Sequence, residues 1–198
     1  NGRISWGSVH EAEVRDLGGL DAVAGRSLGA VLRDGELSAA IAASPEAPML
    51  AISDARLLPP ITDPQKILCV GLNYADHIRE MGRPWPERPV VFTRFPDTLV
   101  GDGEPLVAPR NSSSFDYEGE FAVVIGRTAR HVRASEALDH VLGYSIMNDG
   151  SIRDYQRHTH QFTPGKNFPR SGSLGPMIVT ADEFGNVGPQ RIRTRVNG

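Results

Sequence analysis

The sequence is poor in cysteine, since its 198 residues contain only Cys69. A single thiol excludes a disulfide within the chain, and chains without disulfides are typical of reducing compartments. Cys69 lies in the apolar run Ile67-Leu68-Cys69-Val70, so we expect it to be buried as a small hydrophobic residue. The cysteine content therefore predicts a cytoplasmic protein.

Long hydrophobic runs and an excess of basic charge are absent as well. No apolar stretch approaches the roughly 20 residues that a membrane-spanning helix needs. The formal net charge is −3 and no basic run interrupts the sequence, which argues against a nucleic-acid partner. We therefore expect neither a membrane nor a nucleic acid as partner.

The composition that remains is that of a soluble globular protein, with 39% hydrophobic and 23% charged residues. The chain has 21 glycines and 15 prolines, which predict many turns and a large share of β-structure. At 21.5 kDa it can form one core with a small appendage.

The order of apolar and turn-forming residues predicts two units, residues 1–60 and residues 61–198. The first is a small α+β unit whose connector carries Pro59-Pro60, and the second is mainly β. We expect strands at 4–9, 13–17, 66–71, 90–93, 106–107, 117–126, 177–180 and 192–196. We expect helices at 28–33, 36–43, 73–80 with Asn73 as N-cap, and about 151–158 with a capping box, and loops at 82–89 and 163–175.

Three acidic residues are the candidate metal ligands. Glu118 and Glu120 lie two apart in a predicted strand and would share one face, while Asp149 ends the segment Gly143–Asp149. Carboxylates on one face repel one another unless a cation compensates them. Mg²⁺ or Mn²⁺ suits three carboxylates, and Ca²⁺ is a looser fit. Paired glutamates can also form a solvated strand face, and Asn148-Asp149-Gly150 can be a turn.

A histidine–carboxylate pair and a set of basic residues accompany these acids. His77 and Glu80 lie three apart on the predicted helix and share a face, as a general base and its orienting partner would. Such a pair can equally be a surface contact. Arg153, Gln156 and Arg157 cluster on one face of the helix that follows Asp149, and Lys166 lies in a Pro- and Gly-containing loop. Together these residues favour a metal site for an anionic substrate.

At this point the sequence resembles the fumarylacetoacetate hydrolase family over roughly residues 66–185. The resemblance implies a mixed β-sandwich roll, dimeric in most members, with a smaller leading domain in many of them. Family members continue beyond the point that matches Gly198, so we expect the unit 61–198 to be truncated at its C-terminal end. The motifs that carry the resemblance are KILCVGLNYADHIRE (66–80), FDYEGEFAVVIG (115–126), GYSIMNDGSIRDYQ (143–156), TPGKNF (163–168) and LGPMIVTADE (174–183).

The resemblance also assigns roles to single residues. It implies that His77 and Glu80 activate water from a mobile lid and that Lys166 steadies a developing oxyanion. The substrate-binding residues that it implies are Tyr74, Arg94, Arg153 and Gln156, and the metal ligands are Glu118, Glu120 and Asp149.

The activity that the resemblance implies is hydrolysis of a C–C bond in a β-diketo acid such as an acylpyruvate, a step of aromatic catabolism. The substrate would be a small 2-oxo or 1,3-diketo carboxylate, bound by Mg²⁺ or Mn²⁺ and cleaved through an enolate, in a homodimer. The same site could decarboxylate oxaloacetate-type acids or isomerise 2-hydroxymuconate-type acids.

Two other interpretations stay open. The carboxylates could brace a cation-binding structural module without catalysis, although such a module has no need of His77, Glu80 or Lys166. A zinc site at His158-x-His160 is a weaker alternative, because side chains two apart at a helix end point in different directions.

Overall fold

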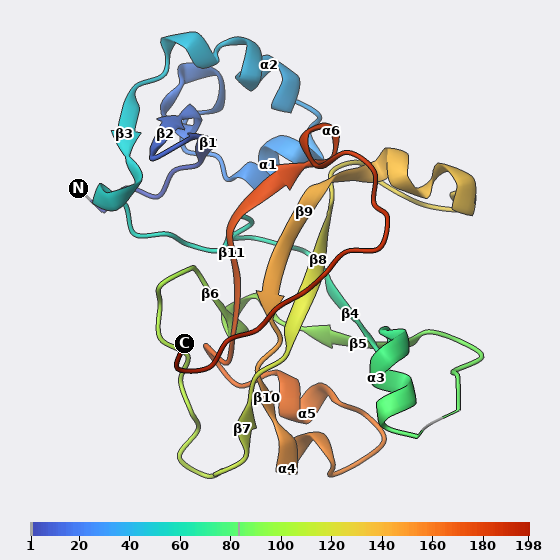
Figure 1. Ribbon diagram of the computed structural model, residues 1–198. Helices are drawn as coiled ribbons and strands as arrows, with labels where there is room; N and C mark the ends of the chain where they lie inside the picture. The colour runs from blue at the N-terminus through green and yellow to red at the C-terminus, as the bar shows by residue number, and fades with distance from the viewer. Residues whose placement is uncertain (1, 83) are drawn as a thin grey trace.

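The computed structural model describes residues 2–82 and 84–198, and Figure 1 traces them from the N-terminus to the C-terminus. Asn1, in the predicted leading unit, and Arg83, in the predicted loop 82–89, lie outside the described residues. None of the helices in the described ranges is long and apolar enough to cross a membrane.

The N-terminal part is a three-stranded antiparallel sheet covered by two helices (Figure 1). Its strands, in the order β1-β2-β3, are β1 (Gly7–His10), β2 (Glu13–Asp16) and β3 (Met49–Ala51), and its helices are α1 (Leu28–Arg33) and α2 (Leu37–Ala42). Ser27 caps α1 by accepting a hydrogen bond from the Ala30 N–H at 3.0 Å. Buried Val23, Val31 and Ala40 form a small core. The division of the chain at residue 60 stays a prediction.

A four-stranded sheet forms the centre of the molecule (Figure 1). Its order is β6-β11-β9-β8, with β11 parallel to β6 and the other pairs antiparallel. The long strands β8 and β9 pair without interruption from Gly119 opposite Asn148 to Val124 opposite Gly143. The strands are β6 (Leu99–Val100), β8 (Gly119–Ile125), β9 (Val141–Asn148) and β11 (Gly172–Thr180).

Two short sheets and four short helices flank this central sheet (Figure 1). Strand β4 (Ile67–Gly71) pairs with β5 (Val90–Arg94), and β7 (Phe115–Asp116) pairs with β10 (Ser151–Ile152). The helices are α3 (Ala75–Glu80), α4 (Arg153–Gln156), α5 (Thr163–Lys166) and α6 (Ala181–Phe184). Figure 1 shows α4, α5, β7 and β10 together at one end of the central sheet, with α6 at the opposite end.

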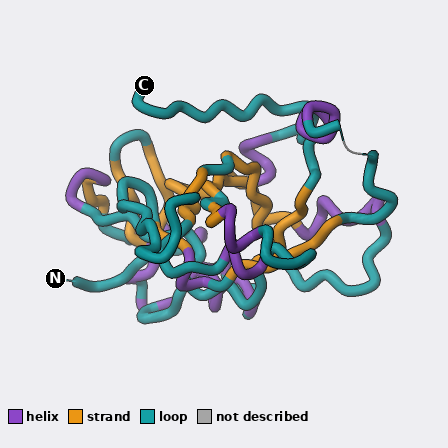
Figure 2. The backbone as a smooth tube through the Cα atoms, turned by 90° about the horizontal axis from the view of Figure 1, so that it is seen from below, coloured by secondary structure: helices purple, strands orange, loops and turns teal. Residues whose placement is uncertain are grey.

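The connections contain short 3₁₀ segments, and residues 185–198 at the C-terminal end have no strand or helix. Figure 2 shows this segment running along one side of the molecule. A Cβ placed on Gly119 would lie 2.5 Å from the Thr194 Oγ1, so the segment passes close to the start of β8. The 3₁₀ segments are Leu17–Gly19, Asp21–Val23, Ser44–Glu46, Ile52–Asp54, Pro96–Thr98 and Ala134–His140.

Several predicted elements differ from the structure. Residues 106–107 and 192–196 are not strands, because neither segment forms a strand ladder within the described ranges, although the Val107 N–H donates to the Arg170 carbonyl at 2.9 Å. The predicted loop 163–175 contains α5 and the start of β11. Ser151 does not open a helix with a capping box, since it lies in β10 and its hydroxyl bonds to the Asp149 carbonyl at 2.8 Å. The N-cap of α3 is Tyr74, one residue after Asn73.

Candidate active site

The ends of β8 and β9 bring the candidate acidic residues together. Glu118 directly precedes β8, and Asp149 directly follows β9. The Asp149 N–H donates to the Glu118 carbonyl at 2.8 Å, and the Glu118 N–H donates to the Asn148 Oδ1 at 3.1 Å. These bonds fix the backbone from which both carboxylates project. Glu118 therefore lies outside the strand that we predicted to contain it.

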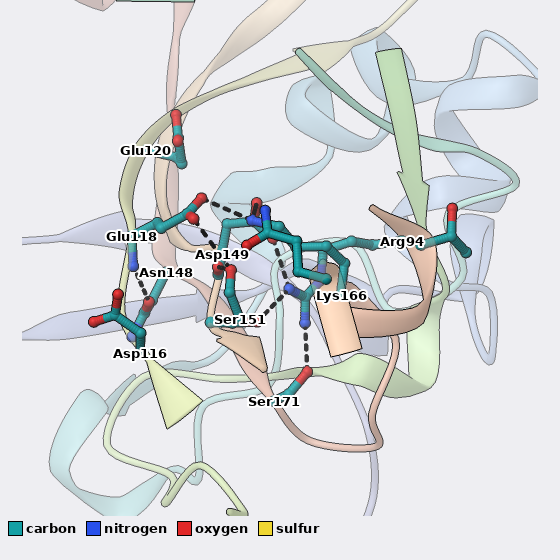
Figure 3. Close-up of polar contacts among 12 residues, drawn as sticks. Arg94, Asp116, Glu118, Glu120, Asn148, Asp149, Ser151, Lys166 and Ser171 are labelled. Carbon is teal, nitrogen blue, oxygen red and sulfur yellow. Dashed lines mark hydrogen bonds and ion pairs between the residues drawn. The ribbon is translucent and has the colours of Figure 1, made fainter. Parts of the chain in front are cut away.

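Lys166 joins the two carboxylates. Its Nζ lies 2.7 Å from the Glu118 Oε2 and 2.6 Å from the Asp149 Oδ2, and its side chain is 1% exposed. Figure 3 shows all three side chains converging on one point. The ammonium also lies 5.0 Å from the centre of the Phe92 ring. A charge-assisted hydrogen bond to each carboxylate makes Lys166 the shared counter-ion of both.

Arg94 supports the other oxygen of Asp149. Its Nη1 lies 2.6 Å from the Asp149 Oδ1 and 2.9 Å from the Gly150 carbonyl oxygen. The Nη2 donates to the Ser171 Oγ at 2.8 Å, and the Nε donates to the Thr98 Oγ1 at 3.2 Å. The side chain is 0% exposed. The guanidinium is thus occupied by protein groups in this structure, and its predicted substrate-binding role stays a prediction.

Arg153 and Gln156 lie on the Glu118 side of the cluster. The Arg153 Nε and Nη2 bind the Asp116 Oδ2 at 2.9 and 2.7 Å, and its Nη1 pairs with Glu118. The same Nη1 donates to the Gln156 Oε1 at 3.0 Å. Ser151 adds a hydrogen bond to the Glu118 Oε1 at 3.2 Å. Of the two predicted substrate-binding residues of α4, Arg153 therefore contacts Glu118 directly, and Gln156 is joined to it through Arg153.

Glu120 has a different environment from Glu118. Within the described residues its side-chain partner is Tyr74, whose hydroxyl donates to the Glu120 Oε2 at 2.7 Å. Burial raises the pKa of Glu120, and repulsion from Glu118 and Asp149 adds to the rise. Figure 3 shows Glu120 to one side of the converging side chains.

The pKa of Glu118 shifts in the opposite direction. Burial alone would raise it, but the charges and hydrogen bonds of Lys166 and then Arg153 outweigh burial and hold the pKa below its ordinary value. Half-buried Cys69 faces the same region: burial and then the charge of Asp149 raise the pKa of its thiol to about 12. Cys69 is therefore a neutral thiol rather than a nucleophile.

The structure does not bring His77 and Glu80 to this cluster. Their side chains are 55% and 83% exposed, and the His77 Nδ1 lies 3.9 Å from the Glu80 Oε2. Among the described residues, no hydrogen bond or ion pair joins either side chain to the acidic residues. The pair exists as predicted, but on a solvent-facing helix.

Two glycines allow the close backbone contacts that hold Lys166 and Asp149 in place. A Cβ on Gly165 would lie 2.4 Å from the Gln156 backbone nitrogen, so α5 can lie against α4 only with glycine there. A Cβ on Gly150 would lie 1.9 Å from the Ser171 carbonyl oxygen. Neither position tolerates a larger residue without movement of the backbone.

A divalent cation fits the donor chemistry of the cluster. Among the described residues, the four carboxylates of Asp116, Glu118, Glu120 and Asp149 outnumber the three cations Lys166, Arg94 and Arg153 by one, and Glu120 is the acid without a cationic partner there. Oxygen donors of this type suit Mg²⁺ and Mn²⁺. Across residues 2–82 and 84–198, no three acidic, histidine or cysteine side chains converge closely enough to hold an ion. The Lys166 ammonium lies between Glu118 and Asp149, two of the three predicted ligands, instead.

One hollow and its aromatic side chains belong to this region but not to the charged cluster. A shallow hollow of about 450 Å³ lies against α4 and α5, and the rings of Tyr155 and Phe168 line it. The His158 ring packs on the Tyr155 ring at a centroid distance of 4.7 Å.

The sequence alone did not identify Asp116, Ser151 and Ser171 as members of the cluster. Asp116 is part of the FDYEGE motif, and its carboxylate two residues before Glu118 was a usable signal. Ser151 and Ser171 carry no such signal, because single serines in turns are common.

Comparisons with known proteins agree on one family. Residues 66–198 match the family described as "Fumarylacetoacetate (FAA) hydrolase C-terminal". The Xenopus laevis protein "Oxaloacetate tautomerase fahd2, mitochondrial" is 40% identical over 152 residues, which are 76% of this chain and 48% of that protein. The chain therefore spans about half the length of this relative.

Solved structures share the fold. The "5-carboxymethyl-2-hydroxymuconate delta-isomerase" from Mycobacterium smegmatis is 40% identical with a TM-score of 0.61, covering 68% of this chain and 53% of that one. The maleylpyruvate hydrolase from Sphingobium sp. SYK-6, solved with manganese(II) and pyruvate, is 26% identical with a TM-score of 0.70, covering 89% and 64%. These likenesses confirm the predicted α+β, mainly β fold.

Proposed function

The chain belongs to the fumarylacetoacetate hydrolase family, and we propose that it is a divalent-metal-dependent enzyme that interconverts the enol and keto forms of a 2-oxo dicarboxylate such as oxaloacetate. One observation carries the proposal: the Lys166 ammonium lies buried between Glu118 and Asp149. Buried ion pairs contribute little to stability compared with well-packed apolar residues. We therefore infer that the cluster has a catalytic role and does not only stabilise a structural module.

The basic residues, Gln156 and the three predicted metal ligands would each have a role in this reaction. As the enol loses its hydroxyl proton to solvent and solvent returns a proton to the neighbouring carbon, Lys166 would donate a hydrogen bond to the oxygen that is negative in the enolate between these two transfers. Arg153 and Gln156 would bind a substrate carboxylate, while Arg94 would keep Asp149 in place. Mg²⁺ or Mn²⁺, when held by Glu118, Glu120 and Asp149, would supply a Lewis acid for the oxygens of the 2-oxo acid.

The exposed position of His77 and Glu80 favours tautomerisation over hydrolysis. Enol–keto exchange needs a stabilised enolate and a proton transfer at carbon, whereas C–C hydrolysis also needs an activated water molecule. The pair that would activate water faces solvent in this structure. The similarity to a relative named as an oxaloacetate tautomerase points in the same direction.

Hydrolysis of a β-diketo acid such as an acylpyruvate is the second candidate. It is supported by the 3.9 Å separation of the His77 Nδ1 and the Glu80 Oε2, and by the likeness to a maleylpyruvate hydrolase. This reaction would require α3 to bring the pair to the substrate. The cytoplasmic location and the homodimer stay predictions, and the relative described above is named as mitochondrial.

The first prediction concerns turnover of oxaloacetate. We expect the full-length protein loaded with Mn²⁺ to accelerate the decay of the enol form, measured by ultraviolet absorbance, and excess chelator to abolish the effect. Lys166→Met removes the oxyanion donor and should lower kcat by about 10²-fold or more. The matched control is Lys66→Met, because Lys66 is the other lysine of the chain and is exposed.

Enol decay at the rate of buffer alone, or full activity in excess chelator, would contradict the proposal. An acylpyruvate tested with the wild type and with His77→Ala separates the two candidates. Cleavage of the acylpyruvate that depends on His77, without any effect on oxaloacetate, would make the protein a hydrolase. Release of CO₂ from oxaloacetate would make it a decarboxylase.

A further inference from the structure

We infer that Tyr74 is a positioning residue that ties α3 to Glu120, so that cation binding at the acidic site and the placement of His77 and Glu80 depend on each other. The inference rests on the proposed role of Glu120 as a metal ligand. It concerns how two parts of the site that the structure holds apart are connected.

The contacts of Tyr74 span both parts. Its hydroxyl donates to the Glu120 Oε2 at 2.7 Å and accepts a hydrogen bond from the Phe121 N–H at 3.1 Å. Tyr74 is also the N-cap residue of α3, and its carbonyl accepts the first helical hydrogen bond, from the Ile78 N–H at 3.0 Å. One residue thus binds strand β8 with its side chain and begins the helix with its backbone.

The chemistry of the hydroxyl favours positioning over substrate contact. A tyrosine hydroxyl has one proton to donate, and here Glu120 accepts it. The lone pair that remains could only accept a hydrogen bond. In its keto form an ionised 2-oxo dicarboxylate offers oxygen acceptors and no donor, so that form has no hydrogen bond to give to Tyr74. This reassigns a residue that we predicted to bind substrate directly.

Because α3 is anchored at its first turn, a change at Glu120 would be transmitted to the helix. Ile78 is the buried residue of the helix, at 2% exposure, while His77 and Glu80 on the same helix face solvent. The helix has six residues, so Tyr74 and Ile78 fix its first turn against the rest of the protein. A cation that reorients the Glu120 carboxylate must either move α3 with it or break the bond to Tyr74. By thermodynamic linkage, the pose of α3 must then influence cation affinity equally.

Tyr74→Phe tests this connection with two measurements that need no turnover. Mn²⁺ affinity is measured by electron paramagnetic resonance, and the mobility of α3 by hydrogen exchange of the amides of residues 75–81. Because groups that orient a metal ligand contribute to affinity, we expect Tyr74→Phe to weaken Mn²⁺ binding roughly 10-fold. We also expect Mn²⁺ to slow exchange in α3 of the wild type but not of the variant. Tyr117→Phe, an exposed tyrosine next to Glu118, is the control and should behave as the wild type.

Wild-type Mn²⁺ affinity in Tyr74→Phe, or an unchanged response of α3 to Mn²⁺, would overturn the inference. Glu120→Gln gives a second test that does not disturb the tyrosine, because its amide oxygen can still accept the hydrogen bond. In this variant α3 should exchange as in the metal-free wild type, with no response to Mn²⁺, and a persisting response would also overturn the inference. If Glu120→Gln binds Mn²⁺ as tightly as the wild type, the metal-ligand assignment itself fails, which is a separate outcome.

Discussion

Glu118 and Glu120 are separated by one residue, yet their pKa values shift in opposite directions. Glu118 accepts hydrogen bonds from Lys166 and Arg153, and Glu120 accepts one from a neutral tyrosine. The cationic partners outweigh burial at Glu118, and burial dominates at Glu120. The neighbouring side chains, rather than the position in the chain, therefore decide which carboxyl group keeps its proton more readily.

This difference predicts how the stability of the metal-free protein depends on pH. A carboxyl group with a raised folded pKa favours the folded state below its unfolded pKa, and that contribution is lost as pH rises through the folded pKa. Ionised Glu120 therefore destabilises the folded state at pH values above its folded pKa. We expect Glu120→Gln to remove this loss, so that its melting temperature exceeds that of the wild type at neutral pH and approaches it at acidic pH. Thermal unfolding followed by circular dichroism across this pH range gives the measurement.

The control for this experiment is Glu136→Gln, a glutamate on an exposed 3₁₀ segment. Its pKa is lowered, chiefly by the Arg133 hydrogen bond, so its contribution to stability is lost as pH falls, the opposite slope. A Glu120→Gln variant that is less stable than the wild type at neutral pH would show that the carboxylate is compensated in the folded protein.

Part of the site could be predicted from sequence at the residue scale. The motifs that contain Glu118, Asp149 and Lys166 indicated that these residues would meet, and the structure places them in contact. The role of Arg94 could not be predicted, because its partner Asp149 lies 55 positions away and only the tertiary fold brings them together. The solvent-facing orientation of His77 could not be predicted either. The spacing of His77 and Glu80 fixes the helix face that they share but not what that face contacts.

At the scale of secondary structure, the contact between α4 and α5 places Lys166. Gly165→Ala would put a methyl group 2.4 Å from the Gln156 backbone nitrogen, so the helices would have to separate. We expect a loss of about 1–3 kcal/mol in unfolding free energy, typical of an overpacked contact, together with lower activity as the ammonium shifts. Denaturant unfolding measures the first effect. Gly188→Ala is the control, because nothing lies within 4 Å of a Cβ there.

A Gly165→Ala variant as stable and as active as the wild type would show that α5 can move away without cost. An equal loss in Gly188→Ala would show that the change in chain flexibility on replacing a glycine, and not the contact between α4 and α5, causes the effect.

The elements that sequence predicted well are those with a strong local pattern. Helix α2 and strands β4 and β5 have apolar periodicity and clear end signals, and the structure confirms them within one residue. Strand β11 begins at Gly172, five residues before its predicted start, because its glycines and Pro176 hide the pattern. Pairing with β9 and β6 stabilises that segment, and a register shift between Gly175 and Val179 accommodates the irregular residues.

On the scale of the whole molecule, one face of the β4–β5 sheet exposes apolar side chains. Leu68 is 63% exposed and Val91 is 56% exposed, and Val70 lies opposite Val91 on the same face. Apolar groups gathered on one face favour association, which would bury them. We predict that the chain self-associates through this face, consistent with the expected homodimer, and that Leu68→Lys weakens the association. Light scattering after size-exclusion chromatography measures the mass.

Leu138→Lys serves as the control, because Leu138 is also 63% exposed but lies on a 3₁₀ segment elsewhere. A monomeric wild type, or equal dissociation in both variants, would exclude this face as the contact.

The burial of Arg94 and Lys166 has a consequence for the ionic strength at which the protein can operate. Dissolved ions screen charges that lie in water, with a Debye length of about 8 Å at physiological salt, but they screen buried pairs far less. Surface pairs such as Arg133–Glu136 should weaken in concentrated salt, while the bonds from Arg94 and Lys166 to Asp149 persist. The geometry of the charged cluster should therefore depend little on the salt concentration of the surrounding solution.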